Sequence, residues 1–237
     1  MSLSEVRHQD HAQRVIERAL LRERVPHAYI FHGPDGVGKE TFARGLAGVL
    51  LCERPVGEAS HSAFKNACGR CVDCRGVRAD THPDLHLIHR YLIREHPDSA
   101  VRKRKGLDIS VDVLRHFLIE RVALTPIRGR AKVFIIREAD SITVQAQNAL
   151  LKTLEEPPGP TFILLLVSAL DRLLPTTLSR CQLVRFDALP TEFVRAKLAE
   201  LVPGLSAEQL DWYARAGNGS LGWAVQAAEG KLFDVND

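Results

Sequence analysis

Two groups of residues in this 237-residue chain have the types and spacing that chemistry requires. One is the glycine-rich stretch GPDGVGKET at residues 33–41, and the other is a set of cysteines of which three are closely spaced. The first pattern is typical of a phosphate-binding loop and the second of a metal site. A glycine-rich turn before a helix can also be purely structural, and so can buried cysteines.

The glycine-rich stretch matches the P-loop pattern G-x-x-x-x-G-K and departs from it at the last position. In such a loop, backbone N–H groups and the following helix N-terminus bind phosphate, and Lys39 can reach the outer phosphates. Glu40 stands where a Ser or Thr hydroxyl normally binds Mg²⁺, and Thr41 comes one residue too late. We therefore assign these residues to a degenerate nucleotide site: Gly33, Gly36, Gly38, Lys39, Glu40 and Thr41.

A second magnesium ligand is altered as well. The apolar stretch that should end in Asp-Glu reads VFIIREAD, which puts Arg137 where the Asp belongs and leaves Glu138. A guanidinium cannot bind Mg²⁺. We expect little or no ATPase activity from the chain alone, with binding of ATP and magnesium weak or absent.

The cysteines predict a zinc site. They are spaced C-x15-C-x2-C-x2-C, and the two-residue gaps let neighbouring sulfurs face one ion. Because every ligand is a cysteine, no position is left open for water, so the zinc is expected to be structural. Cys181 lies far away after an apolar stretch and is expected to pack instead. The predicted ligands are Cys52, Cys68, Cys71 and Cys74.

Strands and helices alternate around these residues. Apolar strands are expected at residues 28–31, 84–89, 133–136 and 161–168, with helices between them and Ser110 as an N-cap. The alternation predicts an α/β fold with a doubly wound parallel sheet up to roughly residue 185. Beyond residue 190 only helical patterns occur, at 191–201, 207–216 and 220–228, and they predict a small all-helical second domain.

Composition and charge exclude other classes of protein. A hydrophobic share of 45% and a charged share of 26% are those of a soluble globular protein. The first 20 residues are charged throughout, and the longest apolar run, at residues 162–170, is too short to cross a bilayer. We expect a cytoplasmic protein with no membrane partner, and clustered cysteines in that compartment favour a metal over disulfides.

The polar stretch at residues 90–105 is expected to be a mobile loop. It contains RKRK at residues 102–105, and the net charge of the whole chain is only +3. Such a run can hold DNA electrostatically, although a charge run in a loop is more often simply solvated.

Five stretches, in order, carry a resemblance: HAYIFHGPDGVGKET, CGRCVDC, TPIRGRAKVFIIREAD, AQNALLKTLEEPP and LLPTTLSRCQ. Over residues 10–228 the chain resembles the AAA+ clamp-loader subunits of bacterial DNA polymerase III. The P-loop alone is not specific, whereas AQNALLKTLEEPP together with LSRCQ is. The resemblance implies a P-loop AAA+ domain at residues 1–187 with a zinc module at about 52–74, and a helical lid domain at 188–237. The family's C-terminal collar domain is expected to be absent from this chain.

Within the family, the resemblance is to the delta-prime type more than to the ATP-hydrolysing gamma/tau type. The gamma/tau type has a complete P-loop, an Asp-Glu strand end and an Arg in a GSLR stretch. Here the corresponding residues are Glu40, Arg137 with Glu138, and Gly222 in GSLGWA. AQNALLKTLEEPP is placed by the resemblance near the DNA chamber, where Gln147, Asn148 and Lys152 are expected either to face DNA phosphates or to be solvated surface.

The SRC motif, residues 179–181, is intact. In this family its arginine acts in trans at the ATP site of the neighbouring subunit, where a guanidinium stabilises charge on the transferring γ-phosphoryl group. The resemblance thus implies that Arg180 is an arginine finger, against the plainer alternative of an exposed cation.

The implied function is that of a stator in a ring-shaped, heteropentameric machine that places the sliding clamp on primed DNA. The implied partners are the gamma/tau and delta subunits, the sliding clamp and primer-template DNA. Two other hypotheses stay open. One is an ATPase motor of the gamma/tau type that uses Lys39 and Glu138. The other is a zinc-stabilised DNA-binding module with a relic P-loop, whose DNA affinity would depend on residues 102–105.

Overall fold

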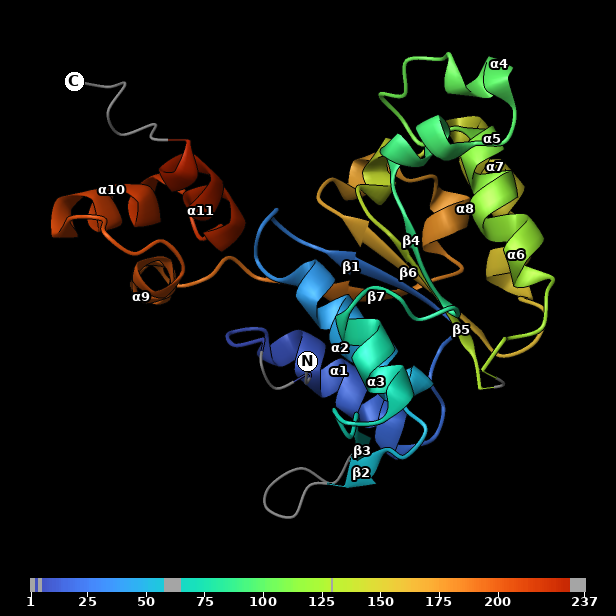
Figure 1. Cartoon of the computed structure of the whole chain (residues 1–237), viewed down its shortest axis with the longest axis horizontal. Coiled ribbons are helices and arrows are strands. Elements are labelled where there is room, and N and C mark those ends of the chain that lie inside the picture. The colour runs from blue at the N-terminus through green and yellow to red at the C-terminus, as the bar shows by residue number, and fades with distance from the viewer. Residues whose placement is uncertain (1–2, 4–5, 58–64, 129, 231–237) are drawn as a thin grey trace.

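A five-stranded parallel sheet forms the centre of the larger part of the molecule (Figure 1). The computed structural model describes residues 3, 6–57, 65–128 and 130–230. The strand order is β4-β5-β6-β1-β7, and each neighbouring pair is parallel. The strands are β1 (Ala28–His32), β4 (Leu85–Ile88), β5 (Lys132–Ile136), β6 (Thr161–Val167) and β7 (Gln182–Arg185).

Helices cover both faces of this sheet, so the predicted doubly wound α/β architecture is confirmed (Figure 1). One face carries α1 (Asp10–Leu21), α2 (Lys39–Leu51) and α3 (Val72–Arg78). The other carries α5 (Val111–Leu114), the π-helical turn η3 (Arg115–Ile119), α6 (Glu120–Val122), α7 (Val144–Glu155) and α8 (Pro175–Leu178). Because both faces are buried, the inner strands have continuous apolar sequences.

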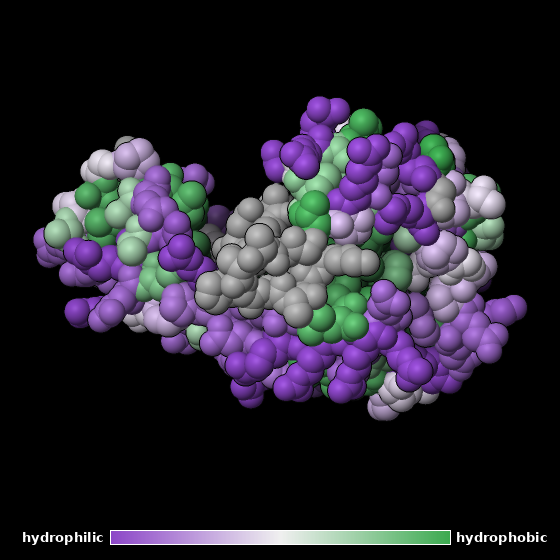
Figure 2. Space-filling model, turned by 90° about the horizontal axis from the view of Figure 1, so that it is seen from below, coloured by the Kyte–Doolittle hydropathy of each residue, from purple (hydrophilic) through white to green (hydrophobic). Residues whose placement is uncertain are grey.

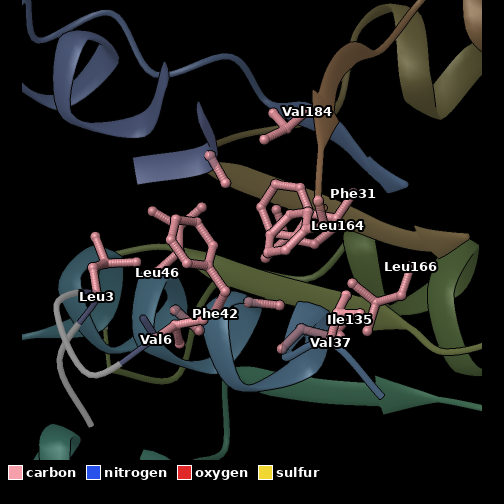
Figure 3. Close-up of a cluster of buried hydrophobic side chains, with 14 of the residues drawn as sticks. Leu3, Val6, Phe31, Val37, Phe42, Leu46, Ile135, Leu164, Leu166 and Val184 are labelled. Atoms are coloured by element: carbon pink, nitrogen blue, oxygen red, sulfur yellow. The ribbon is translucent and has the colours of Figure 1, made fainter. Parts of the chain in front are cut away.

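Successive residues of a strand enter two different hydrophobic clusters. In β1, Phe31 joins the cluster on the α1–α2 face, whereas Ile30 joins the cluster on the α5–α8 face. Figure 3 shows the first cluster, in which Phe31 and Phe42 pack edge to face with ring centroids 5.7 Å apart. Val37 and Phe42 lie on either side of Lys39 in the chain and are both buried, so this cluster anchors the phosphate-loop segment on both sides of Lys39.

Three helices after the sheet form a separate lobe, which is visible in Figures 1 and 2. They are α9 (Thr191–Leu201), α10 (Ala207–Ala216) and α11 (Leu221–Glu229). Helix α10 begins with a capping box in which Ser206 and Gln209 bond each other's backbone N–H groups. The described residues beyond β7 contain no strand, so the predicted all-helical lid is confirmed. On the face seen in Figure 2, hydrophilic residues predominate and hydrophobic residues form small separate patches.

The cysteine-rich insert between α2 and β4 has its own small structure. Strands β2 (Val56–Gly57) and β3 (Lys65–Asn66) pair antiparallel, and α3 follows. Among the described residues, no helix is long and apolar enough to cross a membrane.

The stretch at residues 90–105, which was expected to be a mobile loop, contains two short helices, so the loop assignment is wrong for most of it. This stretch forms the 3₁₀ helix η2 (Arg90–Glu95) and helix α4 (Ser99–Arg102), whose N-cap Asp98 accepts a bond from Ala100 N at 2.7 Å. Leu92, Ile93 and Val101 are buried and anchor the segment. These few apolar residues were hidden among many charged ones, which is why composition alone suggested a loop.

Three other details were not predicted. The helix after Ser110 is capped as expected, with Val113 N 3.4 Å from Ser110 Oγ, but it contains the π-helical turn η3. Helix α8 is a single short turn, and β7 is an edge strand in which only Val184 is buried. Neither has the long apolar or periodic pattern by which inner strands and longer helices are recognised.

Candidate functional site

The phosphate-loop segment joins the end of β1 to the start of α2. Gly33, Gly36 and Gly38 have φ angles of 152°, 70° and 100°, which L side chains rarely adopt. At Gly36 a β-carbon would also collide with Ser220 of the lid. The loop therefore has the backbone conformation for which its glycines are needed.

Lys39 is enclosed by its own loop. Its Nζ donates to the carbonyl oxygens of Gly33 at 2.6 Å and Pro34 at 2.7 Å. It also lies 3.4 Å from an Asp35 carboxylate oxygen and 3.5 Å from Ser168 Oγ at the end of β6. The side chain is only 7% exposed, and burial lowers its pKa against the opposing effect of Asp35. A phosphate that approached Lys39 would have to replace these oxygens.

Glu40 and Arg137, the two residues that replace magnesium ligands, form an ion pair with each other. Glu40 also accepts a bond from Arg44 Nε at 2.9 Å, and Arg44 pairs with Asp80 on the other side. Glu40 and Arg137 are each about one-third exposed, so their attraction is screened and contributes little to stability. Their effect is local: a fixed cation stands where a metal-binding carboxylate is found in a complete site. Thr41 is exposed.

Glu138, the acidic residue that remains at the end of β5, pairs with Arg90 at 3.2 Å. Its φ of 48° places it in the left-handed region. To act as a base for ATP hydrolysis, the Glu138 carboxylate would have to break its ion pair with Arg90 or bind Arg90 and the attacking water together.

The lid touches the phosphate loop directly through two glycines. Gly222 N donates to Gly36 O at 3.1 Å. A β-carbon at Gly222 would lie 2.8 Å from Gly36 Cα, so no side chain fits at position 222 in this arrangement. The three departures named from the sequence, Glu40, Arg137 and Gly222, thus meet around one loop.

Arg180 lies in the turn between α8 and β7. Its guanidinium donates through Nε to Glu155 Oε1 at 2.6 Å and through Nη2 to the same oxygen. Nη1 donates to Thr176 O at 2.9 Å and lies 3.4 Å from Ser179 Oγ. The side chain is 29% exposed, so this oriented cation is reachable from solvent.

The sheet topology separates Arg180 from the chain's own phosphate loop. Strand β7 runs parallel to β1, with Gln182 beside Tyr29 and Arg185 beside His32. Arg180 precedes β7, whereas the loop follows β1, so the two lie at opposite ends of these strands. Four strand residues span roughly 13 Å, which is longer than an arginine side chain. Arg180 therefore does not reach the chain's own phosphate loop.

Gln147 lies neither on a DNA-facing surface nor in solvent. It is 1% exposed, and its Nε2 donates to Ile142 O at 3.2 Å and Arg172 O at 3.1 Å. Its Oε1 accepts bonds from Leu174 N at 2.8 Å and Thr177 Oγ1 at 3.2 Å. The amide thus fastens the segment before Arg180 to α7, a role that its position in a polar stretch did not reveal. Asn148 and Lys152 are exposed, as either expectation for them requires.

The four clustered cysteines are brought together as the spacing predicted. Their sulfur atoms all lie within 4.8 Å of one another, and the Cys52–Cys71 and Cys68–Cys74 pairs are 3.9 Å apart. Tetrahedral Zn–S bonds of about 2.3 Å put sulfurs roughly 3.8 Å apart. The cluster therefore fits a metal ion of this kind.

Backbone N–H groups surround the sulfurs. Cys68 N lies 3.3 Å from Cys52 Sγ, and Cys74 N lies 3.3 Å from Cys71 Sγ. Hydrogen bonds from the N–H groups of Arg70 and Cys71 lower the pKa of Cys68 to about 6, whereas burial raises the pKa of Cys52 and Cys74. Cys181 packs against the α5–α8 cluster, and burial raises its pKa to about 12.

Two buried aspartates connect the cysteine module to the sheet. Asp73, between two of the cysteines, lies 3.3 Å from His82 Nε2 and accepts a bond from Arg128 Nε at 2.8 Å. Asp84, directly before β4, accepts the backbone N–H groups of Ile127 and Arg128, both at 2.7 Å. The module is therefore tied to the loop that precedes β5.

The basic run at residues 102–105 is partly engaged within the chain. Arg102 donates to the carbonyl oxygens of His96 and Pro97 at 2.7 and 2.8 Å, and Arg104 pairs with Asp112 at 2.7 Å. Lys103 and Lys105 are exposed.

Sequence reasoning missed the partners of the charged site residues. Glu155 lies in the stretch AQNALLKTLEEPP, but nothing in its position indicated a bond to Arg180. Asp35 and Arg44 were likewise missed, although each lies four residues from its partner, Lys39 or Glu40, and this spacing is a local signal that could have found them.

Comparisons with known proteins agree with this architecture. A family model described as DNA polymerase III, delta subunit matches residues 8–190. The chain is 38% identical over 190 residues to DNA polymerase III subunit delta' of Pseudomonas aeruginosa, which covers 80% of this chain and 47% of that protein. It is 34% identical over 227 residues to subunit tau of Escherichia coli, covering 96% of this chain and 31% of that protein. The chain thus spans about half or less of these relatives.

Solved structures show the same fold at low sequence identity. The gamma-subunit-related protein of Thermotoga maritima DNA polymerase III gives a TM-score of 0.51 at 19% identity, covering 91% of this chain and 58% of its own. The RuvB Holliday junction branch migration motor of the same organism gives 0.57 at 12%, covering 96% and 63%. These likenesses confirm the predicted AAA+ fold.

Proposed function

This chain belongs to the clamp-loader family of DNA polymerase III, and from that membership we propose that it is a delta-prime-type stator. It hydrolyses little or no ATP itself and donates Arg180 to the ATP site of a neighbouring gamma/tau subunit. Its other partners are the delta subunit, the sliding clamp and primer-template DNA within the assembly.

The ion pair between Glu40 and Arg137 is the observation that carries this proposal. Magnesium needs oxygen ligands and is repelled by a fixed guanidinium. The residues at the two altered positions, Glu40 and Arg137, bind each other. This pairing supports a nucleotide site that is no longer used for hydrolysis. Arg180, by contrast, is reachable from solvent and lies at the sheet end opposite the chain's own loop. That placement supports action on a neighbour.

The proposal includes one structural zinc ion held by Cys52, Cys68, Cys71 and Cys74, which would fix the insert and take no part in chemistry. It also includes a cytoplasmic location, where thiolates stay reduced. We propose residues 1–187 as the AAA+ domain and 188–237 as the lid domain. Glu155 and Gln147, which both lie on α7, link the donated arginine and the segment before it to the AAA+ domain.

The proposal is tested by the ATPase rate of an assembled loader that contains the Arg180→Ala variant. Arginine fingers contribute roughly 10³–10⁵ in rate at the site that they complete. The assembly should therefore lose the share of turnover that comes from the site facing this subunit, while the variant remains folded. Arg185→Ala is the matched control, because Arg185 is an exposed arginine at the other end of β7, the strand that follows Arg180. An Arg180→Ala assembly that hydrolyses ATP at the wild-type rate would contradict the proposal.

A further inference from the structure

The guanidinium of Arg180 is held from two directions. Glu155 Oε1 accepts both Nε and Nη2, and Thr176 O accepts Nη1 at 2.9 Å. These bonds fix the plane of the guanidinium, since it is gripped along one edge and at the opposite nitrogen. The bond between Nη1 and Ser179 Oγ is longer, at 3.4 Å, and is the one that a phosphoryl oxygen can most readily replace.

Both ends of α7 contribute to this arrangement. Near its start, the buried Gln147 fastens Arg172, Leu174 and Thr177, which lead into the turn that carries Arg180. Glu155 is the last residue of the same helix and binds the guanidinium itself. A single rigid helix therefore fixes both the backbone before Arg180 and the head of its side chain.

We propose that Glu155 is the positioning residue of Arg180. It holds the guanidinium extended and in one plane before a neighbouring ATP site is met, so the flexible arginine side chain loses less rotamer freedom when it binds the γ-phosphoryl group. Glu155 does not touch the nucleotide. This inference rests on the proposed function, because it assigns a partner to the donated arginine.

The Glu155 carboxylate also partly neutralises the positive charge of Arg180. Glu155 is 48% exposed, so its charge is screened by water and offsets only part of the field of Arg180. Gln at this position keeps an oxygen that can accept one bond, whereas Ala removes the acceptor altogether. The two substitutions therefore separate loss of orientation from loss of charge.

The first experiment needs no partner. The Nε–H resonance of Arg180 is followed by NMR in the full chain for wild type, Glu155→Gln, Glu155→Ala and the matched control Glu156→Ala. We expect Glu155→Ala to make the Arg180 Nε–H exchange faster with water and to lower its order parameter, while Glu156→Ala leaves both unchanged. An equally restrained Arg180 in Glu155→Ala would overturn the inference.

The second experiment measures ATP hydrolysis by the assembled loader. Glu155→Ala should reproduce most of the loss in kcat seen with Arg180→Ala and leave the KM for ATP unchanged, because the arginine acts on the transferring group. Glu155→Gln should recover part of the rate, and Glu155→Ala combined with Arg180→Ala should be no slower than Arg180→Ala alone.

The two experiments separate the two possible failures. If Arg180→Ala leaves the rate unchanged, the proposed function fails, whatever the NMR result. If Arg180→Ala slows the assembly and Glu155→Ala does not, the arginine is a finger but Glu155 is not its positioning residue. A rise in kcat with Glu155→Ala would also overturn the inference, since it would mean that the carboxylate restrains the arginine from acting.

Discussion

Glu40 and Arg137 are 97 residues apart in the sequence and meet as an ion pair at the phosphate loop. The sequence alone identified each of them as a replacement for a magnesium ligand, because each position can be compared with the residue that the motif normally has there. That the two losses neutralise each other could not be predicted, since the contact joins the start of α2 to the end of β5. Removing Glu40 alone takes the ion-pair partner from Arg137, whereas removing Arg137 alone leaves Glu40 paired with Arg44.

At the residue scale, we predict that Glu40→Thr combined with Arg137→Asp creates magnesium-dependent ATP binding. The double variant restores a hydroxyl and a carboxylate at the two ligand positions, whereas Arg137→Asp alone sets a second carboxylate beside Glu40. Calorimetry with and without Mg²⁺ measures the effect. Wild type is expected to show weak or no magnesium-dependent binding and no phosphate release, and turnover by wild type would favour the motor hypothesis. A double variant that behaves as wild type would contradict this prediction.

The site residues divide in the same way between those that a motif reveals and those that only the structure reveals. The cysteine spacing predicted a cluster, and the four sulfur atoms do lie together. The prediction was possible because ligands of one zinc ion often occur at short, characteristic spacings in the sequence. Glu155 and Gln147 carry no such signal. Gln147 even lay in a polar stretch and is nevertheless buried, because its amide has four hydrogen-bond partners.

At the scale of elements, the cysteine module gives the next prediction. Cys71→Ser should prevent metal binding and lower the thermal stability of the chain, because an ion held by the four cysteines would join Cys52 to Cys74, and Asp73 ties this part of the chain to Arg128. Even a contribution of about 2 kcal/mol would lower Tm by roughly 4–8 °C in a chain of this size.

The matched control is Cys181→Ser, which changes a cysteine outside the cluster. It should retain one zinc ion per chain by elemental analysis. Wild-type protein with much less than one zinc ion per chain, or Cys71→Ser with a full complement, would refute the site.

The elements that could be read from the sequence are those with long, regular patterns. Inner strands such as β5 and β6 are apolar throughout because helices bury both of their faces. The edge strand β7, the single turn α8 and the short helices η2 and α4 have too few residues for a period to be recognised. Their formation depends on tertiary contacts, among them those of Val184, Thr177 and Ile93.

At the scale of the whole molecule, the contact between Gly36 and Gly222 brings the lid against the phosphate loop of the AAA+ domain. Gly222→Arg should displace the lid from the phosphate loop, because even a β-carbon at this position would be 2.8 Å from Gly36 Cα. The lid remains attached through other contacts, including the edge-to-face packing of Phe193 on His8, whose ring centroids are 4.5 Å apart. The variant should therefore be folded but more extended.

Small-angle X-ray scattering measures this change as a larger radius of gyration. Gly48→Ala is the matched control, because a β-carbon there meets only an ordinary contact, 3.6 Å from Ala67 Cβ. A Gly222→Arg chain with the wild-type radius of gyration would contradict this prediction, because it would mean that the arginine fits between the lid and the loop without moving the lid.

The strand order has a consequence for biosynthesis. Strand β1 is the first strand of the sheet to be synthesised, but it lies between β6 and β7. Its pairing partners come much later in the sequence: Ala28 pairs with Ile163, and Tyr29 pairs with Gln182. At 5–20 residues per second, a ribosome needs roughly 7–30 s to translate the residues that separate β1 from β6. Throughout that interval the nascent chain carries an unpaired apolar strand, AYIFH. Newly made copies of this protein should therefore depend on chaperones more than its modest size suggests.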